Sequence, residues 1–119
     1  MARIMLAEDD LTMVTLLKTL LGMEGYQVVA LSIDEDVLDA VHMDRPDVLL
    51  MDVHLPQING LEILNQLRQD EETKDLKIVM TSGLNLEAEC KRSGADDFLL
   101  KPYMPDELLQ VLKKNLNHS

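Results

Sequence analysis

Short apolar runs in this sequence are followed at their carboxyl ends by carboxylates, a hydroxyl and an ammonium group. These polar residues are Glu8, Asp9, Asp52, Ser82 and Lys101. Acids that lie close together repel one another, and a nearby cation relieves that repulsion. A hard divalent ion such as Mg²⁺ prefers oxygen ligands, and an ammonium and a hydroxyl beside it can hold phosphoryl oxygens. The set therefore favours a phosphoryl-transfer site, in which a carboxylate can itself accept the phosphoryl group.

Five apolar runs must bring these side chains together. They are Arg3–Ala7, Gln27–Leu31, Val48–Met51, Ile78–Thr81 and Phe98–Leu100. Each run is too short for a helix and is typical of a strand buried on both faces of a parallel sheet. Between the runs, apolar residues recur every three or four positions, the period of an amphipathic helix. Right-handed crossovers then predict a three-layer α/β domain that binds its ligand at the carboxyl ends of the strands.

Composition narrows the class of protein. The 119 residues suit one domain, and 22 acidic against 11 basic residues give a formal net charge of −11. This acid excess argues against direct binding to nucleic acid or to an anionic membrane. The single cysteine, Cys90, excludes an intramolecular disulfide and a cysteine-based zinc site. The first apolar run is too short for a signal peptide or a membrane span, so a cytoplasmic protein is expected.

Four segments together resemble the receiver domain of two-component response regulators, of the chemotaxis-regulator-like single-domain type. They are IMLAEDD, LLMDVHLPQINGLEIL, IVMTSG and GADDFLLKPY, and the resemblance covers essentially the whole chain. Asp52, Pro56 and Gly60 match the Asp-x-x-x-Pro-x-x-x-Gly spacing of the family. The resemblance implies a doubly wound (βα)5 flavodoxin-like sandwich whose five-stranded parallel sheet has the order 2-1-3-4-5.

The resemblance also implies a metal and phosphorylation site. Asp52 would accept a phosphoryl group from the phosphohistidine of a sensor histidine kinase or of a histidine phosphotransferase. Asp9 and Asp52 would bind Mg²⁺, with Mn²⁺ able to replace it, and Glu8 would hold a metal-bound water. The backbone carbonyl of His54 would complete the protein ligands. Its imidazole is not expected to bind the ion, although the side chain at this position tunes loss of the phosphoryl group in the family.

Further residues would sense the phosphoryl group or support the site. By the same resemblance, Ser82 would donate a hydrogen bond to one phosphoryl oxygen and Lys101 would pair with another. Phe98 would be the switch aromatic, which turns inward when Ser82 moves. The bond before Pro102 would be cis, a geometry mostly confined to proline, while Pro56 and Gly60 would be structural.

The sequence departs from the family near the fourth helix. Only 12 positions separate Ser82 from Gly94, and the family has about three more, roughly one helical turn. A short fourth helix, or a short loop before it, is therefore expected, and a shortened fourth helix would put the family's usual output surface in doubt. Met104 stands where a capping residue is usual, and His42 and His118 are expected to be solvated.

The leading hypothesis is a single receiver domain over residues 1–119 with no output domain in the chain. It would accept a phosphoryl group, change conformation to control a downstream protein that the sequence does not name, and lose the group by hydrolysis. It would not be a conventional enzyme, because it catalyses only its own phosphorylation and dephosphorylation. Three alternatives stay open: a receiver excised from a longer transcription factor or hybrid histidine kinase, a Mg²⁺-dependent phosphatase with an aspartyl intermediate, and a binding module that no longer takes phosphate.

Overall fold

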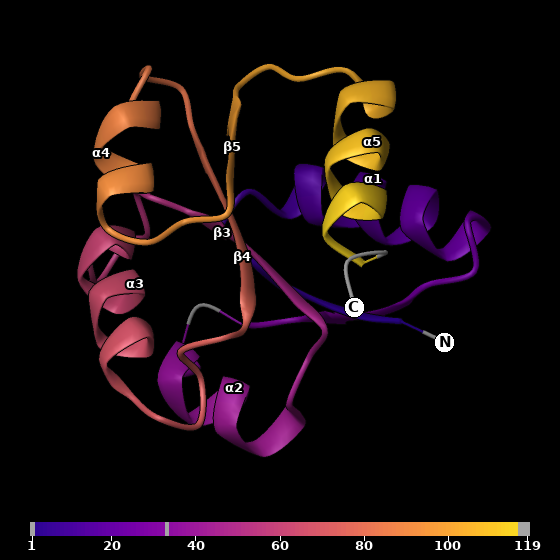
Figure 1. Ribbon diagram of the computed structural model, residues 1–119. Coiled ribbons are helices and arrows are strands. Elements are labelled where there is room, and N and C mark those ends of the chain that lie inside the picture. The colour runs from indigo at the N-terminus through magenta and orange to yellow at the C-terminus, as the bar shows by residue number, and fades with distance from the viewer. Residues whose placement is uncertain (1, 33, 117–119) are drawn as a thin grey trace.

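The computed structural model describes residues 2–32 and 34–116, in which strands and helices alternate along the chain (Figure 1). The strands are β1 (Arg3–Ala7), β2 (Gln27–Ala30), β3 (Val48–Asp52), β4 (Lys77–Ser82) and β5 (Asp97–Leu100). The helices are α1 (Leu11–Met23), α2 (Val37–Asp44), α3 (Gly60–Gln69), α4 (Glu87–Arg92) and α5 (Pro105–Leu116). Every predicted strand is confirmed to within one residue at each end. His118 lies outside the described residues.

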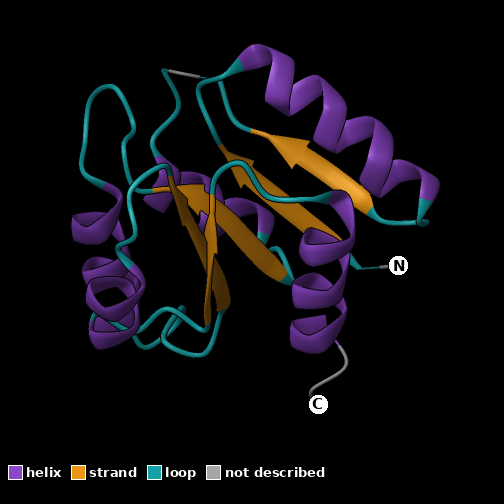
Figure 2. Ribbon diagram, turned by 90° about the horizontal axis from the view of Figure 1, so that it is seen from above, coloured by secondary structure: helices purple, strands orange, loops and turns teal. Residues whose placement is uncertain are grey.

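One parallel sheet with strand order β2-β1-β3-β4-β5 forms the middle layer. Figure 2 shows helices on both sides of this sheet. The side chains of α2, α3 and α4 pack against one face, and those of α1 and α5 pack against the other. The predicted doubly wound three-layer sandwich and its strand order are confirmed. All five residues of β3 are buried, as expected for a central strand covered on both faces.

The strand order creates a switch point between β1 and β3. The chain leaves β1 toward β2 on one side and then returns to β3 on the other side. Loops that depart in opposite directions from neighbouring strands leave a crevice at their carboxyl ends, where ligands bind in such sheets. Glu8 and Asp9 follow β1, and Asp52 is the last residue of β3. The topology therefore delivers all three acids to this crevice.

Local hydrogen bonds and a glycine define several helix ends. Asp10 caps α1 by accepting hydrogen bonds from the backbone N–H groups of Thr12 and Met13. Helix α4 has six residues, as the short spacing predicts, and Gly94 follows it with a φ of 108°, which favours glycine. At the start of α5, the backbone N–H of Met104 donates to the Glu107 carboxylate at 3.1 Å. That bond is the half of a capping box that the Glu107 side chain provides, whereas the methionine side chain provides no cap for the N–H groups of the first helical turn.

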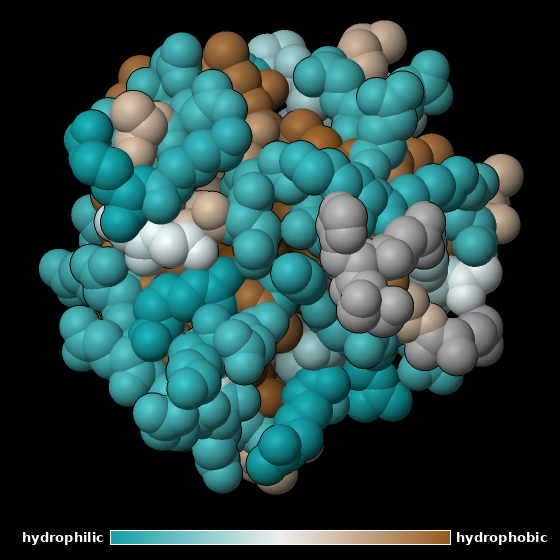
Figure 3. Space-filling model, viewed as in Figure 1, coloured by the Kyte–Doolittle hydropathy of each residue, from teal (hydrophilic) through white to brown (hydrophobic). Residues whose placement is uncertain are grey.

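Figure 3 shows a mainly hydrophilic face with hydrophobic atoms exposed in small separate areas. None of the helices in the described part of the chain is long and apolar enough to cross a membrane.

His42, in the last turn of α2, is partly exposed, with 32% of its side chain accessible to solvent, and it also lies between two hydrogen-bond acceptors. Its Nδ1 is 2.8 Å from the Leu38 carbonyl oxygen, and its Nε2 is 2.8 Å from Asp70 Oδ2, just beyond α3. Both partners are acceptors, so both ring nitrogens donate only when the imidazole is protonated. The hydrogen bond to Leu38 and then the bond to Asp70 raise the pKa of His42 above its usual value. Protonated His42 thus ties α2 to the segment after α3.

Folding stability should fall as the pH rises through the raised pKa of His42. The folded protein holds this proton more tightly than the unfolded chain, so the contribution is complete below the ordinary value of 6.5 and is lost above the folded pKa. Between about pH 6 and about pH 9, the urea midpoint of the wild type should decline more steeply than that of His42→Gln. Asp70→Asn should flatten the profile less than His42→Gln does, because the hydrogen bond to the Leu38 carbonyl remains. Parallel profiles for wild type and both variants would contradict this account.

Candidate functional site

Three carboxylates gather at the carboxyl ends of β1 and β3. One oxygen from each of Glu8, Asp9 and Asp52 lies within 4.8 Å of the others. The side chains of Glu8 and Asp52 are only 7% and 8% exposed, while Asp9 lies at the exposed rim. Burial raises the pKa of Glu8 above its usual value, because a buried carboxylate loses hydration. The predicted acid cluster is therefore present, with two members almost buried.

Lys101 links the two buried acids. Its Nζ donates hydrogen bonds to Glu8 Oε1 and to Asp52 Oδ2. Burial alone would lower the pKa of Lys101, but the hydrogen bonds and charges of the two carboxylates outweigh it and raise that pKa above its usual value. The predicted cis bond between Lys101 and Pro102 is present. Three carboxylates and one ammonium leave a local charge of two negative units, which a divalent cation would balance.

Backbone N–H groups hold the remaining oxygens of the two buried carboxylates. The N–H of His54 donates to Asp52 Oδ1 at 2.7 Å. Glu8 Oε2 accepts from the N–H groups of Asp9 and Asp10 at 2.9 and 3.2 Å. Each carboxylate therefore has one oxygen toward Lys101 and the other toward the backbone. This arrangement fixes the direction in which Asp52 and Glu8 face the crevice.

Ser82 is the last residue of β4 and is fully buried. Asp52 pairs with Thr81 across the sheet, so Ser82 lies one position further toward the crevice on the neighbouring strand. Its Oγ accepts a hydrogen bond from the backbone N–H of Leu84 at 3.0 Å and lies 3.0 Å from His54 Nε2. The sequence does not predict the contact between His54 and Ser82, because the two residues are 28 positions apart and no motif links them.

Phe98 lies further from the crevice than the other predicted site residues. In β5 it pairs with Met80, two positions before Ser82 on β4. Its ring is partly buried and packs against the core on the α2, α3 and α4 side of the sheet. The structure thus brings the acids, Lys101, Ser82 and the backbone of His54 together at the crevice. Phe98 lies further down the sheet and packs against the core.

Gly60, at the start of α3, allows the chain to pass against the backbone of β3. Its N–H donates to the Val53 carbonyl oxygen at 2.7 Å. A Cβ at this position would lie 2.6 Å from the Asp52 carbonyl oxygen and 2.9 Å from Val53 Cα. Both atoms belong to the backbone and cannot swing away. This contact explains why a glycine stands eight residues after Asp52.

Gly60→Ala should therefore destabilise the fold. The added methyl group must push the backbone at Asp52, and such overpacking costs about 1–3 kcal/mol. The free energy of unfolding in urea measures this loss. Gly22→Ala is the matched control, because a Cβ there meets nothing within 4 Å, and it should leave stability unchanged or raised. Equal stability of Gly60→Ala and wild type would contradict the close contact.

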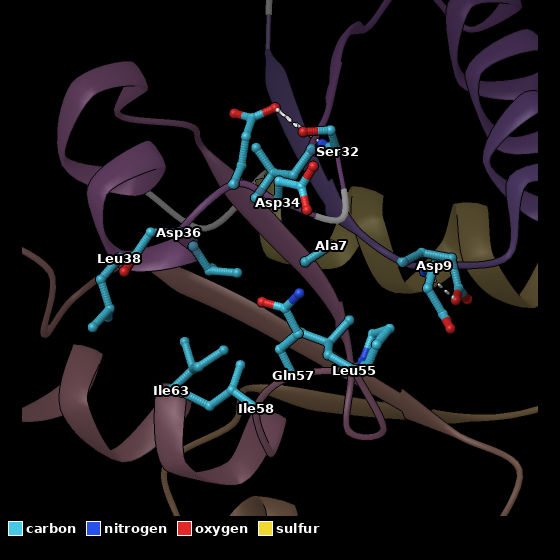
Figure 4. A pocket seen from close by; sticks show the side chains of 15 residues that line it. Ala7, Asp9, Ser32, Asp34, Asp36, Leu38, Leu55, Gln57, Ile58 and Ile63 are labelled. Carbon is cyan, nitrogen blue, oxygen red and sulfur yellow. Dashed lines mark hydrogen bonds between the residues drawn. The ribbon is translucent and has the colours of Figure 1, made fainter.

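A cavity of about 330 Å³ opens beside the acid cluster. Figure 4 shows Asp9 at one side of it, apart from the apolar side chains of Leu55, Ile58 and Ile63. Asp52, Ser82 and Lys101 do not line this cavity. The polar site therefore lies next to the cavity and shares only the acids that follow β1 with it.

The family model for the response regulator receiver domain matches residues 4–113 of this sequence. The chain belongs to that family. It is a response regulator receiver domain of the kind found in two-component systems, and the predicted family, fold and general function are confirmed.

Two curated relatives and one solved structure show how far the likeness extends. The chain is 33% identical, over 98% of its length, to the alkaline phosphatase synthesis transcriptional regulatory protein PhoP of Bacillus subtilis, and covers 49% of it. It is 32% identical, over 94% of its length, to protein PilH of Pseudomonas aeruginosa, and covers 95% of it. The response regulator protein TrrA of Thermotoga maritima, solved in complex with Mg²⁺-BeF, matches with a TM-score of 0.86 and 29% identity over 98% of this chain and 100% of that one. The receiver domain thus spans about half the length of relatives such as PhoP and nearly all of PilH.

Proposed function

We propose that this receiver domain accepts a phosphoryl group on Asp52 from the phosphohistidine of a sensor histidine kinase or a histidine phosphotransferase. A carboxylate oxygen of Asp52 attacks the phosphorus, and the bond between phosphorus and the imidazole nitrogen breaks. That nitrogen keeps the electron pair and takes up a proton. The position of Asp52 carries the proposal. One of its oxygens accepts from the Lys101 ammonium and the other from the His54 N–H, and the carboxylates of Glu8 and Asp9 lie beside it.

Mg²⁺ suits the site, and Mn²⁺ has the same ligand preference. Asp9 and Asp52 would bind the ion, Glu8 would hold a water on it, and the His54 backbone carbonyl would complete the protein ligands. The donor set is all oxygen, and the local charge of two negative units matches a divalent cation. When bound, the ion neutralises charge on the phosphoryl oxygens. The Mg²⁺-BeF complex of the similar protein TrrA supports this choice of ion.

Lys101 and Ser82 would hold the transferred group. Lys101 gives up its contact with Asp52 Oδ2 and pairs with a phosphoryl oxygen, while the Ser82 hydroxyl donates to another. The phosphoryl group adds about 1.5–2 negative charges and shifts an existing equilibrium between two conformations. Phe98 would turn inward as Ser82 moves, and Pro56, Gly60 and Pro102 would keep the loops in place. Hydrolysis then returns the domain to its first state, so its only catalysis is of its own phosphorylation and dephosphorylation.

The phosphorylated domain would act through a protein partner in the cytoplasm. Its formal net charge of −11 disfavours direct contact with nucleic acid or with an anionic membrane. The match to nearly all of PilH supports a single-domain regulator, while the match to half of PhoP supports a receiver within a longer transcription factor. A receiver of a hybrid histidine kinase is a third setting for the same chemistry.

Phosphorylation by a small donor tests the proposal. With acetyl phosphate and Mg²⁺, the intact mass of the wild type should rise by one phosphoryl group, and EDTA should prevent the rise. No gain in mass with Mg²⁺ would contradict the proposal. Steady hydrolysis of p-nitrophenyl phosphate would instead favour the phosphatase alternative.

A further inference from the structure

We propose that the imidazole of His54 is a positioning residue that holds the Ser82 hydroxyl in the unphosphorylated state and releases it when the phosphoryl group binds. The inference rests on the proposed function, because it needs Ser82 to donate to a phosphoryl oxygen. Its basis is the distance of 3.0 Å between His54 Nε2 and Ser82 Oγ.

The hydrogen-bond inventory of Ser82 assigns the direction of this bond. A serine hydroxyl has one proton to donate and two lone pairs that accept. Ser82 Oγ accepts the N–H of Leu84, and among the described residues His54 Nε2 is the one acceptor that its hydroxyl proton reaches. Ser82 is fully buried, and buried donors are satisfied in native proteins. The proton of Ser82 therefore points to the unprotonated Nε2 of His54.

A phosphoryl oxygen competes for that same proton. Phosphoryl oxygens are acceptors, so Ser82 can bind one only by turning its single proton away from His54. The hydrogen bond to the imidazole is lost at that moment, and its free energy is subtracted from the binding of the phosphoryl group. The ring of His54 thus favours the unphosphorylated conformation.

The position of His54 allows it to release Ser82 without disturbing the core. His54 is exposed, so its ring can turn into solvent once the bond is broken. Its backbone stays in place, because the N–H donates to Asp52 Oδ1 and the residue forms an antiparallel bridge with Asn59. One residue therefore contacts the proposed phosphorylation site through its backbone and the proposed phosphoryl-binding hydroxyl through its side chain.

A double-mutant cycle tests the inference, with beryllofluoride as the phosphoryl analogue in saturating Mg²⁺ and calorimetry as the readout. His54→Phe keeps a flat ring that cannot accept the proton, and it should bind beryllofluoride about 2- to 10-fold more tightly than the wild type. His54→Ala should also bind beryllofluoride more tightly than the wild type. This second variant shows that the gain does not come from the larger size of the phenyl ring. In the Ser82→Ala background, neither substitution at His54 should change the affinity.

The outcomes separate this inference from the proposed function. Unchanged or weaker binding by both His54 variants would overturn it, as would a gain of equal size in the Ser82→Ala background. If in those cases the wild type still binds beryllofluoride and Asp52→Asn does not, the proposed function stands. If Asp52→Asn binds beryllofluoride as tightly as the wild type, both the proposed function and this inference are wrong.

Discussion

Asp52→Asn is expected to abolish phosphorylation of the receiver domain by acetyl phosphate in Mg²⁺. The amide has no carboxylate oxygen to attack phosphorus, so no acyl phosphate can form. The fold should survive, because Asn keeps an oxygen for the His54 N–H and Lys101 keeps its bond to Glu8. Intact mass after incubation measures the effect, and thermal unfolding checks that the variant is folded.

Asp34→Asn is the matched control for this experiment. Asp34 is an acid that lines the neighbouring cavity, so its replacement removes the same charge close to the site. It should gain a phosphoryl group as the wild type does. A loss of phosphorylation in Asp34→Asn as large as in Asp52→Asn would mean that net charge, and not the Asp52 carboxylate, governs the reaction.

Lys101→Met is expected to destabilise the metal-free protein strongly. The substitution leaves the carboxylates of Glu8 and Asp52, which are 7% and 8% exposed, without their shared ammonium. Removing one partner of a buried ion pair leaves uncompensated charge, and a loss of roughly 3 kcal/mol in the free energy of unfolding is expected. Urea unfolding in EDTA measures this loss.

Addition of Mg²⁺ should restore much of that stability. Without Lys101 the cluster carries three negative units and no positive one, so a divalent cation relieves more repulsion than in the wild type. The rise in unfolding temperature on adding Mg²⁺ should therefore be larger in Lys101→Met. Lys113→Met removes a lysine that is 54% exposed and should change stability by less than about 0.5 kcal/mol. Similar losses for the two variants would show that Lys101 does not stabilise the acid pair.

Sequence periodicity predicts the backbone of the site because the strands are buried on both faces. A short apolar run such as Val48–Met51 has few alternatives to a central strand, so its end at Asp52 is determined to within a residue. The same reasoning applies to Ser82 at the end of β4. Parallel pairing then brings these ends to one edge of the sheet, which places the functional groups without any knowledge of side-chain rotamers.

Contacts between side chains depend on rotamers and on neighbours distant in sequence. The sequence alone does not predict such contacts. The sequence predicts that Lys101 meets a phosphoryl oxygen when one is bound, but it does not indicate that Lys101 also joins the buried acids Glu8 and Asp52. The bonds of His54 to Ser82 and of His42 to Asp70 each span 28 positions. No spacing rule links such pairs, since the distance between them is set by the packing of whole elements.

The location of the phosphoryl group tests the central claim most directly. Wild-type protein that has been treated with acetyl phosphate and Mg²⁺ can be reduced with borohydride, which converts an aspartyl phosphate to homoserine. Tandem mass spectrometry of the digested protein then identifies the modified position. The account predicts homoserine at position 52 alone. A phosphoryl group found on His54 or Ser82, with Asp52 unmodified, would contradict it.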